Sequence, residues 1–369
     1  MKVDVGGAWH RARRWVSIAA FVVSLLAATH AFAQIAAPAG PSIKIGTTLF
    51  ANYSYTFAPK TADATGREVS ASSFDITRAY LTVTGDITPR VSFRVTSDVV
   101  RETGSGGTLD GSLVLRLKYA YMQLNLAPWL GPHTWVRFGL QSTPITYAVD
   151  QIYRYRFQGS PVPERDAGLS SSDAGASLHV DLPGRHGDVH AAVLNGEGYQ
   201  HAETNGQKAL QVRTSYKPVT SESPLKGVTL QFVVNYDHYA ADLPRHRLLA
   251  SAFYEHRRFN AGLDVLGTQD QPTPASPLTH GGGYSIFVTP FFKTKGAGPE
   301  ALFRLDRFQL DQPTGPSRTR VVVGVAYWFP HTGPGTAALM LDYEGFSTAS
   351  VTPAVPTERR LFVHGLVNF

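Results

Sequence analysis

The residues best suited to chemistry in this chain are basic side chains at polar positions of segments in which polar and apolar residues alternate. A guanidinium keeps its charge at any relevant pH and presents a fork of N–H donors to phosphate or carboxylate oxygens. A row of such groups along a wet path would pass an anion from one to the next. The same charges could instead pair with acidic residues opposite and only hydrate the interior. The basic candidates are Arg78, Arg94, Arg116, Lys118, Arg137, Arg213, Arg304 and Arg360.

Catalytic motifs are incomplete. His280-Gly281-Gly282-Gly283 matches an oxyanion-hole motif of some esterases, but the Gly-x-Ser-x-Gly elbow that accompanies it is missing from the sequence. The histidines form no HExxH pairing, and the glycines around Gly333-Pro334-Gly335 form no phosphate loop. One hydrolase arrangement is left open, a lipid-facing Ser and His pair near a barrel rim. We therefore predict no enzyme, no catalytic residue, no cofactor and no metal site.

The elements that must position the basic residues are strands. In the segment 78–84, Ala79, Leu81 and Val83 oppose polar neighbours, and strict alternation puts one set of side chains on each face of a strand. A barrel in lipid has its apolar face outside and its polar face inside. Sixteen such segments are found, at 43–57, 73–86, 90–103, 111–126, 134–142, 173–182, 187–196, 207–217, 227–239, 246–257, 258–267, 282–293, 300–311, 318–330, 336–346 and 358–369.

The pattern predicts an all-β fold, a closed transmembrane antiparallel barrel of sixteen strands. In lipid each unpaired backbone N–H or C=O is costly, and only closure removes both sheet edges. A soluble exported sandwich is the alternative. The alternation fails in places, because Met122, Leu124, Phe362 and Leu366 fall on the face assigned to water. In the last segment Phe369 falls on the lipid face, which suits an interfacial aromatic girdle and a barrel-closing terminal strand.

The amino end indicates the compartment. Arg11, Arg13 and Arg14 precede an apolar run at 15–28, and Ala31-Phe32-Ala33 follows it. These are the parts of a secretory signal peptide with cleavage before Gln34. We expect a cleaved signal at 1–33, a flexible leader at 34–42, and a barrel at 43–369 in the outer membrane of a Gram-negative bacterium.

Composition excludes other classes. Removing the signal takes away four basic residues and one acidic residue, which lowers the net charge from +6 to +3. That excess, without a basic run interleaved with aromatic residues, does not indicate nucleic-acid binding. Cysteine is absent, so neither disulfides nor thiolate metal sites hold the fold.

The connections alternate in length. Short ones, such as Thr88-Pro89 and Arg257-Arg258, are expected to be periplasmic turns. Longer ones near 58–72, 143–172, 197–206, 268–281 and 347–357 are expected to be extracellular loops. The third loop, 143–172, is the one long enough to plug or narrow the barrel.

Three segments resemble the phosphate-selective porins of the O and P type. They are 74–85, an early strand with Arg78 that ends in Gly85, then 137–144, which leads into the third loop, and 165–168, which leads out of it. The resemblance implies a trimeric sixteen-stranded porin whose third loop folds inward and narrows the pore. Phosphate-selecting members carry lysines on inward loops, whereas this third loop has none. On this basis the pore constriction comprises Asp150, Tyr153, Arg154, Arg156, Glu164, Arg165 and Asp166.

Two functions follow as hypotheses. The first is a water-filled outer-membrane channel for small hydrophilic solutes, weakly anion-selective, with phosphate as the candidate preferred ion. Its partners would be outer-membrane lipid, small inorganic or organic anions as permeants, and two further copies in a homotrimer. The alternative is a non-conducting barrel with a surface-binding or structural role.

Overall fold

The computed structural model describes residues 42–104, 106–145, 152–331 and 333–369, and strands make up most of them. The predicted signal peptide and all of the leader before Ser42 lie outside the described residues. The strands are β1 (Ser42–Ala58), β2 (Thr61–Ala62), β3 (Glu68–Val69), β4 (Ser72–Thr88), β5 (Val91–Arg101), β6 (Leu113–Asn125), β7 (Trp135–Ser142), β8 (Ser172–Asp181), β9 (Gly187–Leu194), β10 (Ala209–Tyr216), β11 (Val228–Tyr236), β12 (His238–Ala240), β13 (Leu243–His256), β14 (Phe259–Asp270), β15 (Thr279–Pro290), β16 (Gly298–Gln309), β17 (Ser317–Trp328), β18 (Thr336–Ala349) and β19 (Glu358–Asn368).

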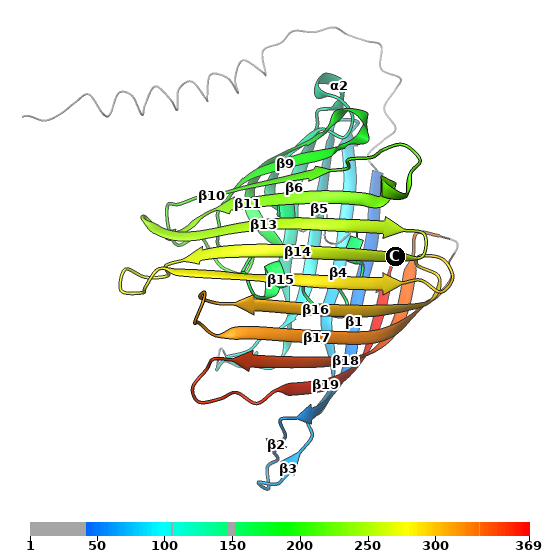
Figure 1. Ribbon diagram of the computed structural model, residues 1–369. Coiled ribbons are helices and arrows are strands. Elements are labelled where there is room, and N and C mark those ends of the chain that lie inside the picture. The colour runs from blue at the N-terminus through cyan, green and yellow to red at the C-terminus, as the bar shows by residue number, and fades with distance from the viewer. Residues whose placement is uncertain (1–41, 105, 146–151, 332) are drawn as a thin grey trace, which may run out of the picture. The chain divides into compact units, whose positions relative to one another are not determined.

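Sixteen strands of the described chain form one closed antiparallel barrel, as predicted (Figure 1). The short β12 continues β11 along the same neighbour, β13, and β2 pairs with β3 in a separate hairpin. No end of a predicted strand differs from the observed end by more than three residues. The helical turns are short, namely α2 (Ala127–Leu130), α4 (Val162–Arg165), η1 (Pro183–Arg185) and η2 (Pro224–Gly227). Among the described residues no helix is both long and apolar enough to cross a membrane.

The seam that closes the barrel joins β1 to β19. Thr47 and Phe369 exchange backbone hydrogen bonds of 2.9 and 3.1 Å, and the ladder continues from Thr48 opposite Asn368 toward Thr56 opposite Arg360. On its other side β1 pairs with β4. Every barrel strand therefore has two neighbours, so no sheet edge is left without partners.

The two faces of each strand differ in burial. In β17 the side chains of Val321, Val323 and Val325 are exposed, while Arg320 and Val322 between them are buried. The exposed set is apolar, which fits an outer wall that faces lipid. The buried set faces the interior, where loop residues cover it.

A β-bulge in β6 corrects one part of the predicted facing pattern. Thr96 lies opposite Tyr119 and Ser97 lies opposite Leu117, so Lys118 is the extra residue. Such a bulge places two successive side chains on one side of the strand, and both Lys118 and Tyr119 are buried. Downstream of the bulge the faces exchange, and Met122 is an exposed outer residue. The assignment of Met122 and Leu124 to the wet face was therefore wrong.

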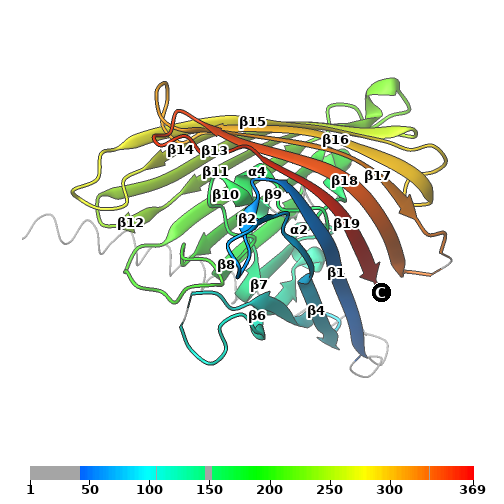
Figure 2. The same cartoon turned by 90° about the horizontal axis from the view of Figure 1, so that it is seen from below.

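The third loop, between β7 and β8, lies inside the barrel. Figure 2 shows its helix α4 within the ring of strands. A buried apolar cluster joins Ile152, Tyr153, Tyr155 and Phe157 of this loop to inner-wall side chains of β1, β13 and β15 to β19. The loop thus crosses the interior from β7 and β8 and packs against the wall formed by β1, β13 and β15 to β19.

Candidate functional site

The carboxylate of Glu300 on β16 is the main polar anchor of the third loop. Tyr155 donates its hydroxyl hydrogen to Glu300 Oε2 at 2.7 Å, and the Arg154 guanidinium lies 3.3 Å from Oε1. The backbone N–H of Gly296 donates to Oε1 at 2.7 Å. Burial, reinforced by the neighbouring carboxylate, raises the pKa of Tyr155, so its hydroxyl stays protonated and remains a donor. Glu300, which the sequence analysis did not identify, therefore neutralises the charge of Arg154 and holds the Tyr155 hydroxyl in place.

A second anchor joins the loop to Arg304 and Asp306, which are also on β16. Arg304 donates to Asp306 Oδ1 at 2.8 Å and to the Tyr153 hydroxyl oxygen at 2.9 Å. Arg165 lies 3.0 Å from Asp306 Oδ2 and donates to Asp166 Oδ2 at 2.6 Å. Each of these loop charges is therefore balanced by an opposite charge close by.

Apolar contacts anchor the loop between these polar points. The Phe157 ring centroid lies 5.6 Å from that of Tyr155 and 5.9 Å from that of Trp328. Leu366, which the alternation placed on the wet side, is part of the same cluster. Its apolar side chain faces inward because it packs against the loop rather than water. The wall residues of this cluster are Phe50, Phe253, Phe287, Leu302, Val322, Ala326, Trp328, Ala338, Met340 and Leu366.

An ion pair inside the loop braces its two arms. Arg156 donates to Glu164 of α4, and the nearby Ser171 accepts a hydrogen bond from Lys118 on β6. Burial raises the pKa of Glu164, but the attraction of the Arg156 guanidinium outweighs it, so the net pKa is below its ordinary value. Of the seven residues predicted to form the constriction, six lie in this inward loop, and Asp150 lies outside the described residues.

The eight predicted basic residues all lie on the inner face, but half of them are held in ion pairs. Arg116 lies 3.2 Å from Asp98 and Arg304 lies 2.8 Å from Asp306. Arg213 is paired with Asp188 and Arg360 with Glu358. For these four side chains the structure favours the reading in which opposite charges pair, and each pair lies within one strand or between adjacent strands of the inner wall.

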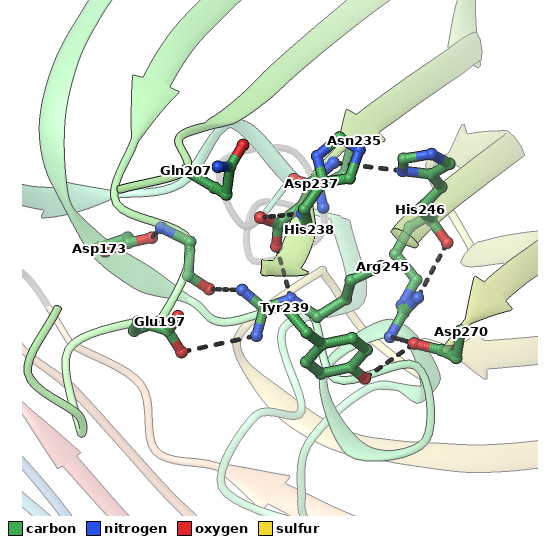
Figure 3. A network of polar contacts seen from close by, with 12 residues as sticks. Asp173, Glu197, Gln207, Asn235, Asp237, His238, Tyr239, Arg245, His246 and Asp270 are labelled. Atoms are coloured by element: carbon green, nitrogen blue, oxygen red, sulfur yellow. Dashed lines mark hydrogen bonds and ion pairs between the residues drawn. The ribbon is translucent and has the colours of Figure 1, made fainter. Parts of the chain in front are cut away.

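Charges near the loop ends of β11, β13 and β14 also pair with one another (Figure 3). Arg245 donates to Asp237 Oδ2 at 2.6 Å and lies 3.7 Å from Glu197. Tyr239, whose ring lies 4.9 Å from the Arg245 guanidinium, donates to Asp270 Oδ1 at 2.9 Å. This network ties the loop between β9 and β10 to β13, and in it three carboxylates face two cations, since Arg247 pairs with Asp270.

Arg78 on β4 and Arg94 on β5 differ from the other arginines. Neither forms an ion pair within the described chain, and the terminal nitrogens of both have no hydrogen-bond partner there. Aromatic rings hold them instead. The Arg78 guanidinium lies 4.9 Å from the Tyr80 ring centroid and 5.2 Å from that of Phe50, and Arg94 lies 4.5 Å from that of Tyr119. Stacked guanidinium groups of this kind keep N–H donors for an anion.

Two neighbouring cavities open on the same wall. One of about 200 Å³ is lined by Arg94, Lys44 and Tyr121, and one of about 810 Å³ is lined by Arg137, Trp135 and polar side chains of β8 to β10. Gln123 lines both cavities. The inner wall here is therefore polar and hollowed, and acidic residues line both cavities beside the basic ones, Asp86 the smaller and Asp181 and Asp188 the larger. The described residues contain no group of three or more metal-ligating side chains.

The closed sixteen-strand barrel with an inward third loop has the fold of outer-membrane porins. It aligns with a loop-deletion form of OmpT, an outer membrane protein of Vibrio cholerae, with 9% identity over 90% of this chain and 100% of that one, at a TM-score of 0.61. The anion-selective porin from Comamonas acidovorans aligns with 11% identity over 89% and 100%, at 0.60. The channel DcaP of Acinetobacter baumannii aligns with 9% identity over 92% and 100%, at 0.58. No family model and no curated relative matches the sequence.

Proposed function

We propose that this protein is an outer-membrane porin, a passive channel for small hydrophilic solutes that is weakly anion-selective. It would be exported through a cleaved signal at 1–33 and reside in the outer membrane of a Gram-negative bacterium. A homotrimer is the proposed assembly. The neighbouring anion-selective porin of Comamonas acidovorans supports the proposal through its shared fold.

One observation carries the selectivity. Arg78 and Arg94 stand on the inner wall, on β4 and β5, and neither has a carboxylate partner in the described chain. Charges act over roughly 8 to 10 Å at physiological salt. In a narrow aqueous path these two cations would raise the local concentration of anions and lower that of cations. Four of the other six predicted lumen cations are each paired with a carboxylate.

Phosphate is the proposed preferred anion only in a weak sense. The guanidinium fork suits its oxygens, but Arg154, Arg156 and Arg165 are all engaged with carboxylates. The loop thus offers phosphate no lysine and few available donors. Phosphate should pass with modest preference and without strong block.

Planar-bilayer recording in a salt gradient tests the proposal. Step conductance establishes the channel, and its absence would support the non-conducting alternative. The wild type should give an anion-selective reversal potential. The double variant Arg78→Gln and Arg94→Gln should lower the anion-to-cation permeability ratio to near unity or below. Arg359→Gln, which removes one charge from the outer face of β19, is the matched control and should leave the ratio unchanged. Cation selectivity in the wild type would contradict the proposal.

A further inference from the structure

The run of glycines at 281–283 has a place in the fold that differs from its esterase-like motif. It lies inside β15, where all three glycines pair with β14 and Gly282 and Gly283 also pair with β16. Its backbone is therefore engaged in the sheet, which leaves no oxyanion hole. What the glycines create instead is a gap in the outer wall.

The gap is an apolar groove of about 620 Å³ on the lipid-facing side of β14 and β15, two strands that lie side by side in Figure 1. Its floor is formed by Gly267 and Gly282, which lie opposite each other in the ladder. A Cβ on Gly267 would meet only one atom, a backbone oxygen at 4.0 Å. The groove is lined by Leu263, Val265, Leu266, Gly267, Gly281, Gly282, Gly283, Tyr284, Ile286 and Gln312.

An unusual cation stands beside this groove. Arg307 on β16 lies directly opposite Tyr284, a groove residue, and directly opposite side chains have Cβ atoms about 4.5 to 5.5 Å apart. Arg307 is exposed and alternates with the inward-facing Asp306 and Phe308, so it is on the outer wall. It forms no ion pair or side-chain hydrogen bond with the described residues. It lies two residues before the end of β16, close to the level of lipid headgroups.

We propose that this groove binds one acyl chain of a membrane lipid whose anionic phosphate headgroup lies on Arg307. The cost of an arginine on the lipid face falls toward the interface, and an anionic phosphate beside Arg307 would make its contact with the membrane favourable. A guanidinium forks onto phosphate oxygens, and the glycine floor accepts a hydrocarbon chain directly beneath. The groove and the charge together match the two chemically different ends of such a lipid.

A second copy of the chain fits this surface less well. The acidic residues of the described barrel strands alternate onto the inner face, as Asp264, Asp306 and Asp342 do. The outer wall of another copy would therefore bring apolar side chains to the groove but no strand carboxylate to Arg307. A lipid supplies both the chain and the charge.

Native mass spectrometry of the purified protein in detergent tests the proposal with two lipids of identical chains. These are dioleoylphosphatidylglycerol, which is anionic, and dioleoylphosphatidylcholine, which is zwitterionic. We expect the wild type to bind the anionic lipid about tenfold more tightly, the strength of one charge-assisted contact. Arg307→Gln should bring the two affinities to parity. Gly282→Leu should fill the groove and weaken both lipids, and the nearest side-chain atom it meets is the flexible end of Gln312 at 2.8 Å.

Arg359→Gln is again the matched control, since Arg359 is another outer-wall cation but does not line the groove. It should retain the preference of the wild type. Equal affinities for both lipids in the wild type, or an equal loss in Arg307→Gln and Arg359→Gln, would overturn the proposal. The proposal would also be overturned if Gly282→Leu lost its oligomeric state but kept its bound lipid, because the groove would then be a contact between copies of the chain. Conductance of all variants should stay at the wild-type value, so failure of this inference is separable from failure of the channel assignment.

Discussion

Replacing Glu300 by alanine should strongly destabilise the protein by releasing the third loop from its main anchor. The Glu300 side chain is fully buried and that of Arg154 is 14% exposed. Removing one partner of a buried ion pair leaves the other charge uncompensated, at a cost of about 3 to 5 kcal/mol in the free energy of unfolding. Tyr155 and Gly296 lose their acceptor in the same change.

Equilibrium unfolding in urea with lipid vesicles, followed by tryptophan fluorescence, measures this cost. The control is Glu255→Ala, since Glu255 pairs with Lys295 at 2.7 Å but both side chains are more than a third exposed. Exposed pairs contribute about 0 to 1 kcal/mol. Adding Arg154→Met to Glu300→Ala should recover part of the loss, because the stranded charge is removed.

The reasoning fails if Glu300→Ala costs no more than Glu255→Ala. It also fails if Arg154→Met lowers the free energy of unfolding by the same amount in the Glu300→Ala background as in the wild type. Such additivity would mean that the two side chains do not interact. In bilayers, Glu300→Ala should produce larger or noisier conductance steps, because the loop is no longer held at that point of the wall.

Three further outcomes follow from the packing and charge of the interior. Phe157→Ala should cost about 3 to 5 kcal/mol of unfolding free energy, whereas Phe292→Ala, which alters a residue 63% exposed in a turn, should cost less than about 1 kcal/mol. The pKa of Glu164 in the folded protein is lowered from 4.5, so its ion pair with Arg156 stabilises the protein fully above pH 4.5 and less as the pH falls through the folded pKa. The difference in thermal midpoint between wild type and Glu164→Gln should therefore shrink from pH 7 to pH 3. Gly262→Ala should cost about 1 to 3 kcal/mol in urea unfolding, since the new Cβ would lie 2.2 Å from the Phe287 ring; a neutral result would show that the ring moves freely.

Strand positions were predictable because the two faces of a barrel wall contact different solvents. Because one face meets lipid and the other meets the interior, apolar and polar or buried positions alternate with a period of two along each strand, as in Val321 to Val325. The exceptions were informative in two ways. Leu366 broke the rule because the third loop, rather than water, covers it, and Met122 broke it because the bulge at Lys118 reverses the faces.

Charge roles were harder to predict than charge positions. Alternation places Arg213 and Arg304 inside, but only three-dimensional neighbours reveal that Asp188 and Asp306 hold them. Glu300 was missed because it lies near the start of a strand with no motif around it. The one available sign of its role was an acidic residue at an inner position next to apolar inner residues. Its partners could not be read from the sequence, because they come from a loop about 145 residues away in the chain.

The seam between Thr47 and Phe369 has a consequence for assembly. The partners Thr48 and Asn368 are 320 positions apart, so the final ladder forms only when the last segment of the chain meets the first one. Until this ladder forms, the edges of β1 and β19 that will face each other present unpaired backbone N–H and C=O groups. The incompletely folded molecule is therefore prone to aggregation. Because the two ends meet side by side, a variant with its ends tethered and a new opening cut in an outer loop should still fold, and it should do so faster as the search for the partner strand shortens.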